Sequence, residues 1–225
     1  MLVNGPGVKL ELGGPGSDNV TALQFFVLLT VLSIVPAILM MVTSFVRISV
    51  VLSFVRSAIG APQLPPNQVV LGLSLFLSLF VMAPTWTRIH ADALEPYLGN
   101  QIQAGEAFER ASGPLREFMF KQVRERDLAL FIQVGNLAQP RTQDDVPTYV
   151  LVPAFMISEL KTAFQMGFMV LVPFLVIDVV VSSVLMSMGM MMLPPATISL
   201  PFKLLLFVMA DGWHLIVRSL VTSFA

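Results

Sequence analysis

The chain has 225 residues, of which 56% are hydrophobic and 12% are charged, and its formal net charge at pH 7 is −1. Soluble domains carry about 25% charged residues, so this composition is typical of a membrane protein. The small net charge provides no field for nucleic acid, and the sequence has no cysteine for a disulfide or a thiolate metal site. We therefore expect a membrane protein that does not bind nucleic acid.

The chain divides into four segments, which together predict an all-α membrane protein of two helical hairpins. Residues 1–19 hold five glycines and two prolines and lack the basic start and apolar run of a signal peptide. We expect a flexible lead there, fitting a processed or trimmed N-terminus. Residues 20–87 predict an apolar hairpin, residues 88–146 a hydrophilic and partly helical segment, and residues 147–225 a second apolar hairpin.

The first hairpin begins with an uncharged stretch between Asp18 and Arg47. This stretch exceeds the roughly 20 residues that a helix needs to cross a bilayer. We expect its helix to continue to Ile59. A second, shorter helix is expected over residues 67–83, ending near Pro84 because proline removes a helical hydrogen bond.

The hydrophilic segment, between residues 88 and 145, holds 16 of the 27 charged residues of the chain. Within it, residues 114–131 place Leu115 and Phe118 at helical spacing, with charged residues on other faces. This pattern predicts an amphipathic helix outside the lipid. It either packs on the rest of the subunit or, through Phe118 and Phe131, anchors a neighbouring subunit.

Three charged residues interrupt the apolar stretches 153–168 and 173–190: Glu159, Lys161 and Asp178. An ionised group in hydrocarbon costs roughly 2.5–3.5 kcal/mol or more, so such residues face a protein interior, a partner or a wet pathway. Lys161 and Asp178 are separated by roughly 25 Å of helix, less than the hydrocarbon thickness of about 30 Å. Arg47 also lacks an acidic neighbour in sequence, and its pairing with Asp178 is one possibility.

The two hairpins share a pattern that indicates an internal repeat. Gly60 and Gly189 are each followed five residues later by Pro-Pro, and then by FVMAPTW over residues 80–86 or FVMADGW over residues 207–213. A repeat in a membrane protein often places a site at the interface of its two copies. The alternative is two similar hairpins without a shared site, and the relative orientation of the copies stays open.

The turn of the second hairpin is rich in methionine. Flexible, polarizable methionine side chains repack around objects of varying shape, and a ring of them could close a channel by dewetting. The alternatives are a Met-rich core turn or a tip that faces lipid. The candidate gate residues are Met186, Met188, Met190, Met191 and Met192.

Long segments of the chain resemble a known family. PAFMISELKTAFQMGF (153–168) and PFLVIDVVVSSVLMSMGM (173–190) are similar to the two signature segments of the FliP/SctR family, and the resemblance covers nearly the whole chain. LREFMFKQVRERDLALF (115–131) is more similar to the flagellar branch than to the injectisome branch. The resemblance implies a core subunit of the type III secretion export apparatus, forming the gate through which unfolded proteins cross the bacterial inner membrane.

The resemblance also implies partners and residue roles. The implied partners are further copies of the chain, in a pentamer within a larger helical assembly, FliQ-like and FliR-like subunits, other membrane proteins of the export apparatus, unfolded secretion substrates and membrane lipid, with no cofactor. Glu159 and Lys203 are implied to pair between adjacent subunits, Phe118 and Phe131 to lie at subunit contacts, and Met190–Met192 to form a gasket. In the flagellar basal body much of the subunit is expected at periplasmic level.

Three classes of function compete. The first is the pore-forming subunit of a protein exporter, flagellar or, alternatively, an injectisome paralogue. The second is a proton-coupled secondary transporter, motivated by the repeat and by Asp178, Asp211 and His214. The third, a membrane enzyme, is disfavoured because the sequence contains no HExxH, GxSxG, P-loop or GxGxxG motif. We expect neither catalysis nor a metal site.

Overall fold

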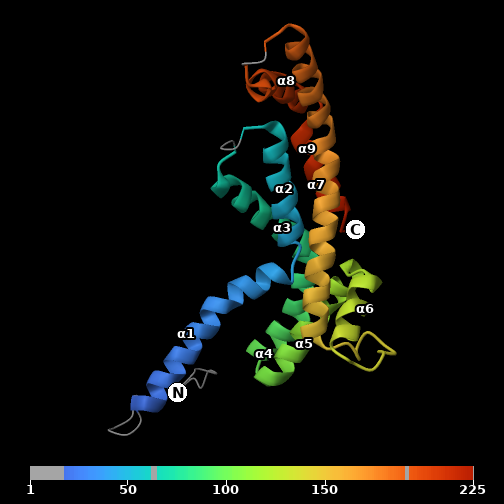
Figure 1. Ribbon diagram of the computed structural model, residues 1–225. Helices are drawn as coiled ribbons and strands as arrows, with labels where there is room; N and C mark the ends of the chain where they lie inside the picture. The colour runs from blue at the N-terminus through green and yellow to red at the C-terminus, as the bar shows by residue number, and fades with distance from the viewer. Residues whose placement is uncertain (1–17, 62–64, 191–192, 225) are drawn as a thin grey trace. The chain divides into compact units, whose positions relative to one another are not determined.

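A computed structural model describes residues 18–61, 65–190 and 193–224 (Figure 1). Over these residues the chain is helical and contains no strand, which confirms the all-α prediction. The flexible lead predicted for residues 1–19 lies outside the described residues, apart from Asp18 and Asn19, which begin the first helix.

The chain forms two compact units, residues 1–39 and residues 40–225. The first unit contains most of α1 (Asp18–Met41), whose described side chains from Phe25 onward are exposed. The second unit contains all the other helices.

The chain leaves helical geometry between α1 and α2 (Phe45–Ile59), so the prediction of one continuous helix through Ile59 is wrong. Two hydroxyl residues occupy the break. Thr43 accepts a hydrogen bond from the first amide of α2 at 3.4 Å, and the Ser44 hydroxyl lies 3.0 Å from that of Ser78. Such side-chain hydrogen bonds offer the backbone an alternative to helix.

The second helix of the first hairpin is longer than predicted. α3 (Asn67–Ile89) passes through Pro84 and continues as a π-helix, η1 (His90–Leu94), and as α4 (Glu95–Leu98). The predicted end near Pro84 is therefore wrong. Proline removes one hydrogen bond, the one to the carbonyl four residues earlier. Here that carbonyl belongs to Phe80, and both Pro84 and Phe80 lie on the exposed side of α3, so the helix continues although this bond is missing.

The hydrophilic segment forms α5 (Ala104–Gln122) and α6 (Glu125–Val134). The single helix predicted for residues 114–131 is therefore two helices. The break falls at Arg124, whose backbone is extended and whose N–H donates to the Ser158 hydroxyl at 3.0 Å. This tertiary hydrogen bond replaces the one that a continuous helix would have supplied.

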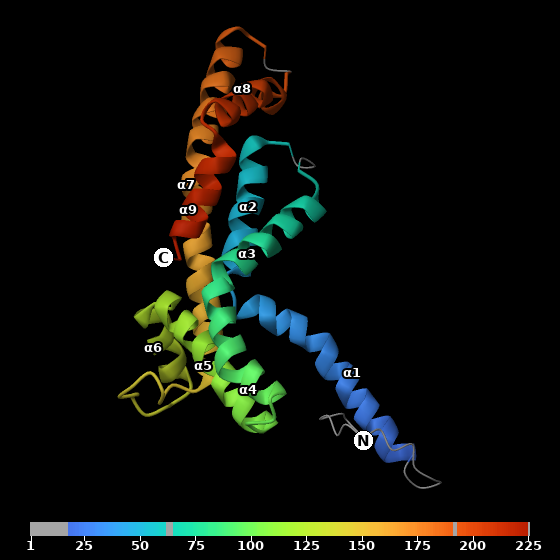
Figure 2. The ribbon, with the colours of Figure 1, turned by 180° about the vertical axis from the view of Figure 1, so that it is seen from behind.

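The longest helix, α7 (Thr148–Ser187), has 40 residues and continues through Pro153 and Pro173. In Figure 1, α2 runs beside it, while α5 and α6 pack near its N-terminal end. α8 (Pro195–Met209) packs on its C-terminal end, and α9 (Gly212–Thr222) runs back along it, as Figure 2 shows from behind.

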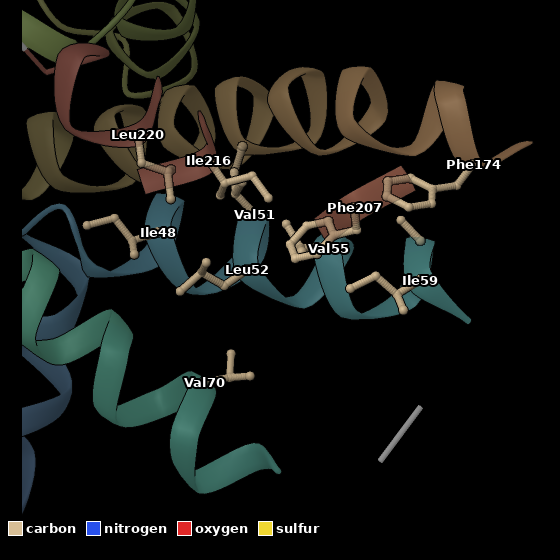
Figure 3. Packing of buried hydrophobic residues seen from close by; sticks show 12 residues of the cluster. Ile48, Val51, Leu52, Val55, Ile59, Val70, Phe174, Phe207, Ile216 and Leu220 are labelled. Carbon is tan, nitrogen blue, oxygen red and sulfur yellow. The ribbon is translucent and has the colours of Figure 1, made fainter. Parts of the chain in front are cut away.

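A hydrophobic cluster lies between α2, α7 and the last two helices (Figure 3). α2 contributes apolar residues at intervals of three and four positions, the spacing of one helix face. Gly167 lets α7 approach α2 closely, because an added Cβ would lie 2.5 Å from the Phe54 ring. The central residues of the cluster are Ile48, Val51, Leu52, Val55, Ile59, Phe174, Phe207, Ile216 and Leu220.

A second hydrophobic cluster fixes the hydrophilic segment to the start of α7. Met119 of α5 is buried there, and Phe118 and Leu128 pack against it. The other buried residues of the cluster are Val42, Val146 and, from α7, Val150, Leu151 and Phe155. The amphipathic segment therefore packs on its own subunit, as one of the two alternatives predicted.

The glycines that begin the two hairpin turns share a backbone conformation. Gly60 has φ +81° and Gly189 has φ +74°, values that favour glycine, and each turn leads through Pro-Pro into the next helix. The copies differ further on. α3 continues through its FVMA sequence, whereas after α8 the chain turns at Asp211, with φ +49°, and bends by 62° into α9.

Candidate functional site

Arg47, in the first turn of α2, is buried and binds groups from three other parts of the chain. Its Nε donates to Glu159 Oε2 at 2.9 Å, its Nη2 pairs with the other carboxylate oxygen and donates to Gln122 Oε1 at 3.0 Å, and its Nη1 donates to the Ser223 carbonyl at 3.0 Å. The guanidinium carbon lies 3.9 Å from the centre of the Phe224 ring. We call these five residues the Arg47 cluster.

The Arg47 cluster explains how Glu159 is tolerated among apolar neighbours. The exposed fractions of the two side chains are 3% for Arg47 and 0% for Glu159. A planar guanidinium matches a carboxylate through two parallel hydrogen bonds, and the remaining donors of Arg47 are satisfied by oxygens of the same chain. The cluster thus ties α2, α5, α7 and the residues after α9 together.

A second ion pair links α7 to α8. Lys203 Nζ donates to Asp178 Oδ2 at 2.6 Å, and the Ser199 hydroxyl donates to Asp178 Oδ1 at 2.6 Å. Lys203 also lies beside the end of α2, because a Cβ added to Gly60 would be 3.6 Å from its Nζ. A helix C-terminus favours a cation, so Lys203 is placed to stabilise the contact between the two hairpins.

Two predictions about these ions have different outcomes. The pairing of Arg47 with Asp178 is wrong: Arg47 binds Glu159, which lies 19 positions, or about 28 Å, from Asp178 along α7. The pairing of Glu159 with Lys203 between adjacent subunits stays a prediction. Within one chain both residues already have partners, Arg47 and Asp178 respectively.

The other polar and aromatic candidates lie as follows. Lys161 is exposed, and no acidic group of the described residues lies within salt-bridge distance of it. Phe118 and Phe131 are half-buried. The Phe118 ring packs on Phe155 at 5.9 Å and on Phe224 at 6.2 Å between ring centres, so it belongs largely to the core of its own subunit. The roles of both phenylalanines at subunit contacts stay predictions.

The Met-rich turn closes the end of α7 in a defined geometry. The Gly189 N–H donates to the Met186 carbonyl at 3.1 Å, and the Met190 N–H donates to the Leu185 carbonyl at 3.0 Å. With a left-handed glycine, this pattern is a Schellman motif. The motif ends the helix abruptly and turns the chain toward α8.

The methionines of this turn point largely away from the core of the subunit. Met186 and Met188 are 57% and 66% exposed, and Met190 is half-buried. Met191 and Met192 lie outside the described residues. Beside the turn, an apolar groove of about 470 Å³ runs between α7 and α8, lined by residues such as Val180 and Phe202.

Two helical stretches are long and apolar enough to cross a membrane, residues 67–98 and residues 148–187. The number rises to four if the pairs α1 with α2 and α8 with α9 each count as one bent span. At 1.5 Å per residue, α7 is about 60 Å long, twice the hydrocarbon thickness of about 30 Å. Hydropathy alone therefore does not fix which part of α7 lies in lipid.

Sequence reasoning missed three members of the Arg47 cluster: Gln122, Ser223 and Phe224. They lie 75 to 177 positions from Arg47, so no local pattern brings them together. The one available signal was that Gln122 falls on the apolar face of its helix. In the part of the chain that the structure describes, no group of three His, Asp or Glu side chains is arranged to hold a metal ion.

Comparisons with known proteins agree with these features. The sequence profile of the FliP family matches residues 28–220. The chain is 55% identical to flagellar biosynthetic protein FliP of Bacillus subtilis (strain 168) over 208 residues, which is 92% of this chain and 94% of that protein. It is also 55% identical to FliP of Caulobacter vibrioides over 96% of this chain and 82% of that protein, and 53% identical to FliP of Pectobacterium carotovorum over 97% and 85%. The chain belongs to the FliP family.

Proposed function

We propose that this protein is a pore-forming core subunit of the flagellar type III export gate, through which unfolded flagellar proteins cross the inner membrane. Membership of the FliP family, with relatives named flagellar biosynthetic proteins, supports a role in flagellar export. The apolar helices support a place in the inner membrane. In the assembly, much of the subunit is held at periplasmic level.

The exposed apolar face of α7 is the observation that carries this proposal. Large apolar side chains are exposed from Ile157 to Met186, over about 44 Å of helix. The exposed Lys161 and the Asp178 ion pair interrupt this face. A bilayer core of about 30 Å is shorter than this face. A core placed so that it excludes both ionisable positions covers even less of it. Other protein subunits must therefore cover part of it.

The covering subunits are further copies of the chain, in a pentamer, together with FliQ-like and FliR-like subunits and other membrane proteins of the export apparatus. The apolar groove between α7 and α8 supports this assignment, because it offers only apolar side chains to a neighbour. Membrane lipid covers the outer surface of the assembly.

The Met-rich turn is the gate in this proposal. Its exposed methionines stand at the end of a rigid helix, and copies arranged around an axis would bring them together. Unbranched thioether side chains fill irregular gaps and yield to objects of varying shape. A constriction lined by them excludes water and ions when no substrate is present and deforms when an unfolded chain passes.

The alternative of a proton-coupled transporter has less support. Asp178 is engaged by Lys203, and Asp211 and His214 are exposed, with no hydrogen bond between their side chains within the described residues. A transporter would instead require polar groups converging on a substrate at the interface of the repeats.

The test replaces Met190, Met191 and Met192 with alanine in the complete export complex. We expect ion leakage across the membrane to rise, because three smaller side chains seal the constriction less well. The matched control replaces Met169 and Met209, which are exposed elsewhere on α7 and α8. Two results would contradict a gating role for this turn. In the first, leakage in the Met190–Met192 variant stays at the wild-type level; in the second, it rises equally in the control.

A further inference from the structure

A cavity of about 630 Å³ lies in the hydrophilic segment, between the end of α5, α6 and the loop that leads to α7. Its lining is part apolar and part polar: Gln139, Thr142 and Gln143 contribute polar side chains, and Glu125 and Arg141 are exposed charged residues on its rim. The apolar part is formed by Phe120, Val123, Leu128, Ile132 and Val146. The surrounding segment is rich in charge, and the cavity lies outside the stretches long and apolar enough to cross a membrane.

The loop that closes the cavity is fixed in place by hydrogen bonds. The Arg116 guanidinium donates to the Thr148 hydroxyl at 2.6 Å and to the carbonyls of Gln143 and Val146 at 3.0 and 2.7 Å. At the other side of the loop, the Asp145 carboxylate accepts two backbone N–H groups. The cavity is therefore formed before any partner arrives, which lowers the entropic cost of binding.

The same segment carries an aromatic side chain that is exposed on the surface of its own subunit. Phe108, near the start of α5, is 76% exposed, the largest value among the described phenylalanines. Its neighbours Glu106, Glu109 and Arg110 are charged, so the ring does not lie in the membrane. It does not line the cavity of its own chain. Aromatic residues, phenylalanine among them, are enriched at protein interfaces relative to the rest of the surface.

We propose that Phe108 of one copy inserts into this cavity of the next copy. Glu109, next to the ring in sequence, carries a charge opposite to that of Arg141 on the rim, so the two can meet when the ring inserts. The inference rests on the self-assembly that is part of the proposed function.

The kind of contact matters for the assembly. A protruding group on one surface and a cavity on a different surface make a heterologous contact, which generates a ring if its rotation closes and a helical assembly if it does not. The cavity is larger than one phenyl ring, so it has room for the turn of helix that carries Phe108. A second copy therefore suits the cavity better than an isolated side chain.

The test uses disulfide cross-linking, for which the chain offers an empty background because it has no cysteine. The double variant Glu109→Cys with Arg141→Cys is produced at full length in bacterial membranes and oxidised. We expect cross-linked species of two or more copies on a denaturing gel. The matched control pairs Glu109→Cys with Leu130→Cys, which is exposed on α6 but does not line the cavity.

A second variant tests the ring itself. Adding Phe108→Ala to the Glu109→Cys and Arg141→Cys pair should weaken the contact at least roughly 30-fold, the effect of a strong anchor at an interface. Cross-linking should fall accordingly while the helix content, measured by circular dichroism, is unchanged. Cross-linking that persists after Phe108→Ala overturns the proposal.

The remaining outcomes separate this inference from the proposed function. Equal cross-linking in the Leu130→Cys control overturns the inference, because the contact would be non-specific. A complex of several copies in which the Glu109→Cys and Arg141→Cys pair does not cross-link also overturns it but leaves the proposed function standing. If the native complex contains only one copy of the full-length chain, both the inference and the proposed function fail.

Discussion

Breaking the Arg47–Glu159 pair should destabilise the subunit strongly. Replacing one member of a buried ion pair leaves the other charge uncompensated, which costs about 3–5 kcal/mol. Arg47→Met removes both hydrogen bonds to Glu159 and the contact with the Phe224 ring, so we expect the upper end of that range. Glu159→Gln leaves Arg47 its bonds to Gln122 and Ser223, so we expect the lower end.

The assay is equilibrium unfolding of the purified chain in detergent, followed by circular dichroism. The double variant Arg47→Met with Glu159→Leu should be less destabilised than Arg47→Met alone, since it buries no unpaired charge. Glu117→Gln is the matched control. Its pairs with Arg88 and Lys121 are exposed, and solvent screens them, so its effect should be small. Equal effects of Glu159→Gln and Glu117→Gln would refute the reasoning.

A charge swap decides which partner Glu159 uses. Glu159→Lys should unfold the subunit, and adding Arg47→Glu should restore part of the stability if the pair within one chain is the important one. Adding Lys203→Glu should then restore nothing. If Lys203→Glu restores assembly and Arg47→Glu does not, the pairing between adjacent subunits holds and the pairing within one chain is secondary.

Three further outcomes are expected. Gly167→Ala should destabilise by about 1–3 kcal/mol, because its methyl group would overlap a phenylalanine ring of α2. Gly72→Ala, inside α3 and with open space around it, should instead stabilise by roughly 0.5–1 kcal/mol in the same unfolding assay. Asp178→Ala leaves the buried Lys203 without its ion-pair partner. Because Asp178 is partly exposed, the loss in the free energy of unfolding should lie between about 1 kcal/mol, the value for a surface pair, and about 3–5 kcal/mol, the value for a buried pair. An unchanged stability would contradict a contribution from this pair. Backbone hydrogen bonds from two loop amides lower the pKa of Asp145. The loop should therefore keep its order above about pH 4, the ordinary pKa of aspartate, and lose it as the pH falls through the lowered pKa. Hydrogen exchange of those two amides measures this order, and exchange that becomes faster from pH 4 to pH 6, beyond the intrinsic increase, would contradict the prediction.

Sequence patterns sufficed for the features that depend on neighbouring residues. The class of fold follows from long uncharged stretches, and the turns at Gly60 and Gly189 follow from glycine placed before Pro-Pro. The amphipathic part of α5 follows from the spacing of Leu115 and Phe118. In each case the deciding interaction lies within a few positions along the chain, where periodicity reports it.

The features that sequence reasoning missed depend on contacts between distant segments. The break between α5 and α6 is stabilised by Ser158 of α7, and the break before α2 by Ser78 of α3. The partner of Arg47 lies 112 positions away, and the sequence suggested Asp178 instead of Glu159. A single sequence does not reveal which of two carboxylates in apolar sequence lies within reach of one arginine.

The mass of the native complex tests the central claim, that other subunits cover the exposed apolar face of α7, most directly. The full chain is extracted from bacterial membranes in mild detergent, together with whatever it binds, and weighed by native mass spectrometry. We predict a particle that contains several copies of this chain and further membrane subunits. A particle with the mass of a single chain, its Met-rich turn covered by detergent alone, would contradict the account.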